Sequence, residues 1–243
     1  MSPAMTLPEA VLFDMDGTLV DTERLWWEVT EAVGTALGHT LGPADTPHVV
    51  GRAVQDTAAH LADVTGAALA EDLAATLEEA FLRRVRAGAP LRPGAARLLA
   101  ALTTHGIPFA LVSASPRSVV DTVVAGALAQ VPFAFTLSAD DTARTKPHPD
   151  PYEAAAARLG IITARCVAVE DSPDGAASAD AAGCAVLVVP SLIPVPPSPR
   201  RTFLSCLTDV DVATLGRITD TALPDPGVSR ERPCLTFGGD GAS

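Results

Sequence analysis

The recurrence of short apolar runs between helical patterns constrains the fold of this chain more than any other feature. The runs lie at residues 10–13, 108–112, 133–137, 166–169 and 185–189. Patterns that predict helices lie between them, at 95–104, 117–125, 150–159 and 173–182. Continuously apolar strands that alternate with helices are typical of a parallel sheet covered on both faces. The sequence therefore predicts an α/β protein with a Rossmann-like parallel sheet.

The interval between the first and second runs is far too long for a single crossover helix. It contains amphipathic patterns at residues 25–37, 57–64 and 68–85. We expect residues 22–89 to form an inserted α-helical cap domain on a core made of residues 1–21 and 90–205.

The end of the chain divides into two parts. An amphipathic pattern predicts a C-terminal helix within residues 206–223. Residues 224–243 are rich in Gly, Pro and charge, so we expect a flexible tail there.

The charge of the chain argues against two classes of partner. Its formal net charge is -12 at pH 7, and Lys146 is its only lysine. Without a basic patch, nucleic acid and anionic membrane surfaces are repelled. The N-terminus lacks the pattern of a secretory signal and no apolar run could span a bilayer, so we expect a cytoplasmic protein. The sequence does not decide between a monomer and a homodimer.

Two pairs of acidic residues follow apolar runs. Asp14 and Asp16 follow the first run, and Glu170 and Asp171 follow the fourth. Open α/β sheets gather their ligands at the carboxyl ends of the strands. If the first and fourth strands are neighbours, Asp14, Asp16 and Asp171 converge, and a cation is needed to keep them ionised. Oxygen ligands without His or Cys indicate Mg²⁺ rather than zinc.

Groups that could bind an anion lie at two other places in the sequence. Ser113 and Ser115 follow the second run, where hydroxyls and backbone N–H groups precede a predicted helix. Lys146 lies in a turn with Pro147, directly before the helix predicted at 150–159. We therefore expect an anionic group to bind between these two places and the acidic residues.

These motifs, in this order, resemble the haloacid dehalogenase-like (HAD) superfamily, in its subgroup with a helical cap between the first and second strands. The resemblance covers roughly residues 10–190. It rests on D-x-D-G-T-L-V-D at 14–21, the run ending in Ser113, the isolated Lys146-Pro147, and E-D-S at 170–172 followed by D-G-A-A-S-A-D-A-A-G. It implies a phosphatase that acts on a small phosphorylated metabolite.

The resemblance also implies roles for the acidic residues. Asp14 would be the nucleophile that forms an aspartyl-phosphate, and Asp16 would protonate the leaving oxygen and then activate water. Mg²⁺ would be held by the Asp14 side chain, the Asp16 backbone carbonyl and Asp171. Glu170 would bind the metal directly or support its ligands.

The same resemblance assigns the phosphate-binding groups. Ser113 and Lys146 would hold the transferred phosphoryl oxygens, and the Gly17 N–H would add a donor. Ser115 and Arg117 would border this pocket.

Departures from the family pattern separate its branches. The dehalogenases lack the second Asp, which is present here as Asp16, and the phosphonate-cleaving members need a cap lysine that this chain lacks. Members that resemble β-phosphoglucomutase carry a His and a cap Arg where Trp26 and Val54 stand here. Phosphomonoester hydrolysis, with a sugar phosphate first among substrates, is the favoured interpretation. A phosphosugar mutase and a non-catalytic phosphate-binding regulatory protein are the alternatives.

Four residues are candidates for substrate contact, namely Thr22, Trp26, Arg52 and Arg117. Adjacent helical residues diverge by about 100°. One of Trp26 and Trp27 is therefore expected in the cap core and the other at the substrate entrance. Arg52 either reaches the substrate or is an exposed structural residue.

Overall fold

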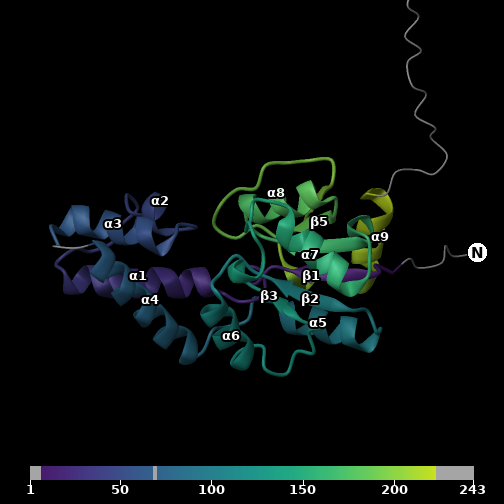
Figure 1. The fold of residues 1–243 in the computed structure, drawn as a ribbon, viewed down its shortest axis with the longest axis horizontal. Coiled ribbons are helices and arrows are strands. Elements are labelled where there is room, and N and C mark those ends of the chain that lie inside the picture. The colour runs from purple at the N-terminus through teal and green to yellow at the C-terminus, as the bar shows by residue number, and fades with distance from the viewer. Residues whose placement is uncertain (1–6, 68–69, 223–243) are drawn as a thin grey trace, which may run out of the picture.

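The computed structural model describes residues 7–67 and 70–222 (Figure 1). The tail predicted at 224–243 lies outside the described residues. Within them a single six-stranded sheet has the order β3-β2-β1-β4-β5-β6, and every neighbouring pair is parallel. The strands are β1 Ala10–Phe13, β2 Phe109–Val112, β3 Thr136–Leu137, β4 Cys166–Glu170, β5 Ala185–Val188 and β6 Arg201–Phe203. The predicted α/β fold is confirmed.

Two strands differ from the prediction. The run expected at 133–137 pairs as a strand only over Thr136–Leu137, and β6 was not predicted. The three residues of β6 are half-buried or exposed at the edge of the sheet. They include Arg201 and Thr202, so no apolar run marks the strand in the sequence.

Both faces of the sheet are buried under helices. Val11 and Phe13 of β1 belong to one apolar cluster, and Ala10 and Leu12 belong to another, because successive strand residues point to opposite faces. The first cluster includes residues of α5 Ala95–Thr104, α6 Arg117–Ala125 and α9 Val212–Ala222. The second includes residues of α7 Asp150–Leu159 and α8 Pro173–Ala182. In Figure 1, α8 lies above the strands and α5 and α6 lie below them.

Four helices between β1 and α5 lie to one side of the sheet in Figure 1. These cap helices are α1 Thr22–Ala36, α2 Thr46–Val49, α3 Val54–Thr65 and α4 Ala70–Arg86. They enclose a separate apolar cluster that includes Val29, Leu61 and Leu77. The four-residue α2 was not predicted, because it is too short to show helical periodicity.

The chain enters and leaves the cap helices through two segments that lie side by side. The Asp21 N–H donates to the Pro90 carbonyl at 2.9 Å, and the Arg92 N–H donates to the Leu19 carbonyl at 2.8 Å. These bonds hold the two segments together. The first residue of α1, Thr22, lies beside the loop that follows β1, because its Oγ1 donates to Asp16 Oδ1 at 2.7 Å.

Three short 3₁₀ helices complete the secondary structure of the described residues: Ala139–Asp141, Thr163–Arg165 and Leu207–Asp209. Among those same residues, no helix combines the length and apolar character needed to cross a membrane.

Candidate active site

The pairing of β1 with β4 brings together the acidic residues at their carboxyl ends. Phe13 is paired with Val169, and the Asp14 N–H donates to the Val169 carbonyl at 3.0 Å. Carboxylate oxygens of Asp14, Glu170 and Asp171 lie within 4.8 Å of one another, and all three residues are buried. We call these three carboxylates the acidic centre.

The Asp16 carboxylate was expected at the same point, but the structure places it elsewhere. Its Oδ1 accepts a hydrogen bond from Thr22 Oγ1 at 2.7 Å. Its Oδ2 accepts bonds from Ser113 Oγ at 3.0 Å and Ser115 Oγ at 2.8 Å. Three hydroxyls, one from α1 and two from the loop after β2, therefore hold this carboxylate, and the third carboxylate of the acidic centre is that of Glu170.

Lys146 neutralises part of the acidic centre. Its Nζ lies 2.7 Å from Asp14 Oδ1 and 2.6 Å from Glu170 Oε1, and its side chain is buried. Burial alone lowers the pKa of the Lys146 ammonium group, but the charges of Asp14 and Glu170 outweigh burial and raise it above its usual value. The lysine is therefore charged and fixed within the centre.

Tyr152 was not predicted as part of the site. It is fully buried on α7, and its hydroxyl donates to Glu170 Oε1, the oxygen that also binds Lys146. The Lys146 Nζ lies 5.2 Å from the centre of the Tyr152 ring. The one available sequence signal was that this is the only tyrosine in the chain.

The acidic centre carries more negative charge than its single lysine balances. Burial is the main cause that raises the pKa of Asp14 well above its usual range; Lys146 opposes the rise, and the neighbouring carboxylates add to it. Burial, followed by the charge of Glu170, raises the pKa of Asp171 to about 7. Ionisation of both Asp14 and Asp171 at neutral pH therefore requires a further positive charge.

A divalent cation fits this centre. Asp14 Oδ2 is buried and, among the described residues, has no hydrogen-bond partner. A buried carboxylate oxygen without a partner is costly, and a metal ion would satisfy it. The donors are all oxygens, the ligand type that Mg²⁺ prefers.

Two glycines allow the backbone to approach the acidic centre closely. A Cβ atom on Gly17 would lie 2.1 Å from Asp171 Oδ2, and Gly17 has a φ of +79°. A Cβ atom on Gly175 would lie 2.0 Å from Glu170 Oε2. The Gly17 N–H, expected to bind phosphate, donates instead to the Val20 carbonyl at 2.8 Å. The closeness of Asp171 and the backbone conformation are therefore the reasons for glycine at position 17.

A cleft of about 420 Å³ lies between the cap helices and the core, next to Asp16. Thr22, Trp26 and Arg52 line it, as the candidate assignments require, and so does Ser115. Trp27 does not line it and packs against the apolar cluster of the cap helices. Trp26 packs against the same cluster, so the two tryptophans differ only in that Trp26 also lines the cleft.

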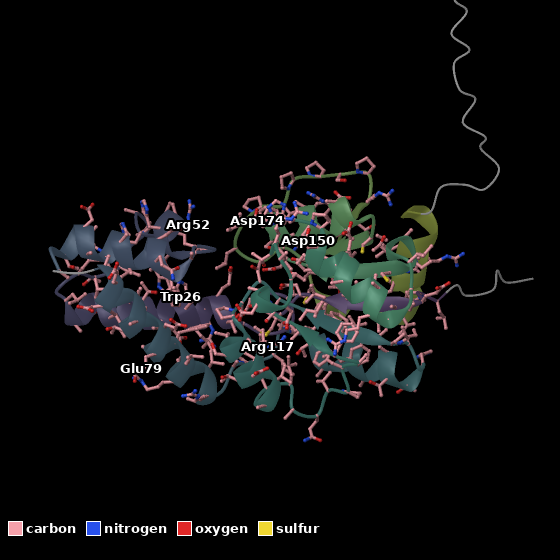
Figure 2. All side chains as sticks on the ribbon, viewed as in Figure 1. Trp26, Arg52, Glu79, Arg117, Asp150 and Asp174 are labelled. Carbon is pink, nitrogen blue, oxygen red and sulfur yellow. The ribbon has the colours of Figure 1, made fainter. Side chains whose placement is uncertain are left out.

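Arg117, also a candidate for substrate contact, is bound to the core. It does not line the cleft, and its guanidinium binds Asp141 and donates to Thr136 Oγ1 at 2.8 Å. Figure 2 labels Arg117 on the core side of the molecule, whereas Trp26 and Arg52 lie among the cap helices. Its partners hold it to β3 and to the 3₁₀ helix that follows this strand.

Glu23 lines the cleft and was not predicted as part of it. It follows Thr22 on α1, and Ser191 Oγ donates to its Oε2 at 3.4 Å. Burial, followed by the charge of Asp16, raises the pKa of Glu23. No sequence pattern distinguishes it from an ordinary acidic residue in the first turn of a helix.

Comparison with known proteins agrees with this geometry. The model of the haloacid dehalogenase-like hydrolase family matches residues 8–183. Hexitol phosphatase B of Escherichia coli (strain K12) is 29% identical over 214 residues, which cover 86% of this chain and 94% of that protein. Phosphoglycolate phosphatase of Rhodospirillum rubrum is 32% identical over 195 residues, which cover 75% of this chain and 80% of that protein.

One solved structure is similar to this chain over nearly the whole length of the solved protein. It is CbbY from Rhodobacter sphaeroides in complex with phosphate, with a TM-score of 0.69 and 25% identity over 86% of this chain and 99% of that chain. The sheet order, the acidic centre and the phosphatase relatives all support the same family assignment. This chain belongs to the haloacid dehalogenase-like hydrolase family and is a phosphatase.

Proposed function

We propose that this protein is a Mg²⁺-dependent phosphomonoesterase that forms an aspartyl-phosphate on Asp14. The observation that carries this proposal is the state of the Asp14 carboxylate. Lys146 binds its Oδ1 at 2.7 Å, while its Oδ2 is buried without a hydrogen-bond partner among the described residues. A carboxylate fixed by Lys146 through one oxygen and by a metal ion through the other would be held in place for nucleophilic attack.

The residues of the acidic centre would hold Mg²⁺. Asp14 and Asp171 supply carboxylate oxygens, and the Asp16 carbonyl completes the protein ligands. Glu170 supports them, because its Oε1 binds Lys146 and Tyr152 and its Oε2 accepts bonds from Asp171 N and Ser172 Oγ at 3.3 Å each. When bound, the metal ion supplies positive charge that offsets the negative charge of the phosphoryl oxygens.

The reaction then proceeds in two steps. In the first, Asp14 forms a bond to phosphorus as the bond to the leaving oxygen breaks, and Asp16 donates its proton to that oxygen. In the second, water attacks the phosphorus of the aspartyl-phosphate and Asp16 takes the proton from water. The bond from phosphorus to the Asp14 oxygen breaks, which regenerates the Asp14 carboxylate and gives inorganic phosphate. The hydroxyls of Thr22, Ser113 and Ser115 hold the Asp16 carboxylate between these steps.

The substrate is a small phosphorylated metabolite, with sugar phosphates as the first candidates. The cleft beside Asp16 encloses about 420 Å³, which is in the range of pockets for small molecules. Hexitol phosphatase B, whose name indicates a sugar alcohol phosphate, matches 86% of this chain.

Phosphate release from a panel of phosphomonoesters tests this proposal. We expect hydrolysis with Mg²⁺, loss of hydrolysis with EDTA, and recovery when Mg²⁺ is added back. Asp14→Asn should be inactive, whereas the control Asp121→Asn, at an exposed carboxylate on α6, should be active. Hydrolysis that survives chelation or Asp14→Asn would rule out the mechanism, and isomerisation without phosphate release would indicate a mutase.

A further inference from the structure

The cleft beyond Asp16 has apolar walls on both sides. Trp26, Val54 and Phe81 contribute from the cap helices. Pro116 and Val119 contribute from the start of α6 in the core. The leaving group of a phosphomonoester bound next to Asp16 would lie between these walls.

Trp26 presents only its apolar ring to the cleft. Its indole Nε1 donates to the Val49 carbonyl at 3.1 Å, so the polar group of this side chain is already bound. Its ring meets the Phe81 ring edge to face, with centroids 5.4 Å apart and planes at 90°. These two contacts fix the indole as a flat, rigid surface that suits an apolar or aromatic group and offers no partner for hydroxyls.

The charged residues of the cleft disfavour a second anionic group. Three of its lining residues are acidic, namely Asp16, Glu23 and Glu78, and one is basic, namely Arg52. The Arg52 Nε already donates to the Pro47 carbonyl at 2.8 Å. A carboxylate or second phosphate on the leaving group would therefore meet an excess of negative charge.

We infer that the leaving group of the substrate is an uncharged alcohol that carries a flat apolar or aromatic body. This inference rests on the proposed phosphatase function and narrows its substrate class. A sugar phosphate belongs to this class only when it bears such a body and no second anion. Among the sugar and sugar alcohol phosphates proposed above, those without such a body are poorer substrates, as are bisphosphates and phosphorylated carboxylic acids.

Matched phosphomonoesters test both parts of this inference. Benzyl phosphate and 2-hydroxyethyl phosphate compare an aromatic body with a small polar one on primary alcohols. 2-Phosphoglycolate and 2-hydroxyethyl phosphate compare an anionic substituent with a neutral one of similar size. We expect kcat/KM for benzyl phosphate to exceed that for 2-hydroxyethyl phosphate by at least about tenfold, and 2-phosphoglycolate to be the poorest of the three.

Two pairs of variants assign the preference to the cleft. Trp26→Ala should lower the ratio of kcat/KM for benzyl phosphate to that for 2-hydroxyethyl phosphate at least about fivefold. Trp27→Ala, which removes a tryptophan outside the cleft, should leave that ratio unchanged. Glu78→Gln should raise the relative rate on 2-phosphoglycolate severalfold. Glu79→Gln, at an exposed glutamate that does not line the cleft, should not.

The outcomes separate this inference from the function on which it rests. Hydrolysis of all three esters with no preference, or with preference for 2-hydroxyethyl phosphate or 2-phosphoglycolate, overturns the inference and leaves the phosphatase function intact. If none of the three esters is hydrolysed, both the inference and the proposed phosphatase function are overturned. If Trp26→Ala does not fold, as judged by circular dichroism, Phe81→Leu replaces it with the same expected fall in the ratio, and an unchanged ratio there overturns the inference.

Discussion

The Lys146 ammonium nitrogen lies 2.7 Å from Asp14 Oδ1, although the two residues are 132 positions apart in the sequence. Both are buried, at 3% and 8% exposure of their side chains. When one partner of a buried ion pair is removed, the other charge stays buried without compensation, and the folded state is destabilised. This relationship makes Lys146 important for the fold as well as for the reaction.

Lys146→Met should therefore affect both activity and stability. Removing the ammonium group leaves the acidic centre without its protein cation, so we expect a loss of about 3–5 kcal/mol in the free energy of unfolding in EDTA. Phosphate release should fall at least about 100-fold, because a charge that stabilises the transferred phosphoryl group is lost. Urea denaturation and steady-state kinetics measure the two effects.

The matched control for this prediction is Arg165→Met. Arg165 forms an ion pair with Glu9 at 3.0 Å, but both side chains are 49% exposed, so the pair contributes little. Equal losses of stability in the two variants would contradict the assigned role of Lys146.

Thr22→Val should impair the reaction while leaving the fold intact. It removes the hydroxyl that donates to Asp16 Oδ1 at 2.7 Å and keeps the shape of the side chain. Because a misaligned general acid transfers its proton poorly, we expect kcat to fall about tenfold or more. Thr22→Ser retains the hydroxyl and should recover most of the rate, and steady-state kinetics on any accepted ester will show whether it does.

Tyr152→Phe should lower kcat about tenfold and the free energy of unfolding by about 1–2 kcal/mol. The variant keeps the buried ring and removes the hydroxyl that holds Glu170 Oε1 beside Lys146. The control Thr219→Val removes another buried hydroxyl, which bonds to the Leu215 carbonyl within α9. It should lower stability without changing kcat, and a full rate in Tyr152→Phe would show that the hydroxyl does not position Glu170.

Asp45 should make the stability of the protein depend on pH in the acid range. Its Oδ1 accepts bonds from His60 Nε2 at 2.8 Å and His39 Nε2 at 3.0 Å, and its Oδ2 accepts from the Gly42 N–H at 2.7 Å. The bonds from His60 and Gly42 are the main causes that lower the pKa of Asp45 to about 2. The folded state therefore favours the ionised carboxylate.

The sign of the effect follows from this lowered pKa. The contribution of Asp45 is fully present above the unfolded pKa of about 4 and is lost as pH falls towards 2. Asp45→Asn should lower the free energy of unfolding by about 1–3 kcal/mol at pH 7, and by less at pH 3. Urea denaturation at both pH values measures this. Asp63→Asn, at an exposed carboxylate on α3, is the control. If Asp45→Asn lowered the free energy of unfolding equally at both pH values, the pH dependence would not come from Asp45.

Much of the fold could be predicted because its signals are local. The apolar runs of β1, β2, β4 and β5 and the helices α5 to α8 lie where the residue patterns indicate them. A serine directly before Pro173 is typical of a helix N-cap, and the Ser172 Oγ accepts a bond from the Gly175 N–H at 3.1 Å. The strand β6 and the helix α2 were missed, because a polar edge strand and a single helical turn leave no periodic pattern.

The sequence by itself determined which chemical groups are available and where along the chain they stand. Acidic residues after two apolar strands, a single lysine and hydroxyls after a third strand were enough to predict a phosphate site with a metal. Only the tertiary structure decided which of them meet. It turned the Asp16 carboxylate towards three hydroxyls, brought Tyr152 to Glu170 and bound Arg117 to Asp141. The physical reason is that such contacts depend on side-chain directions across strands and helices far apart in the chain, which no local pattern records.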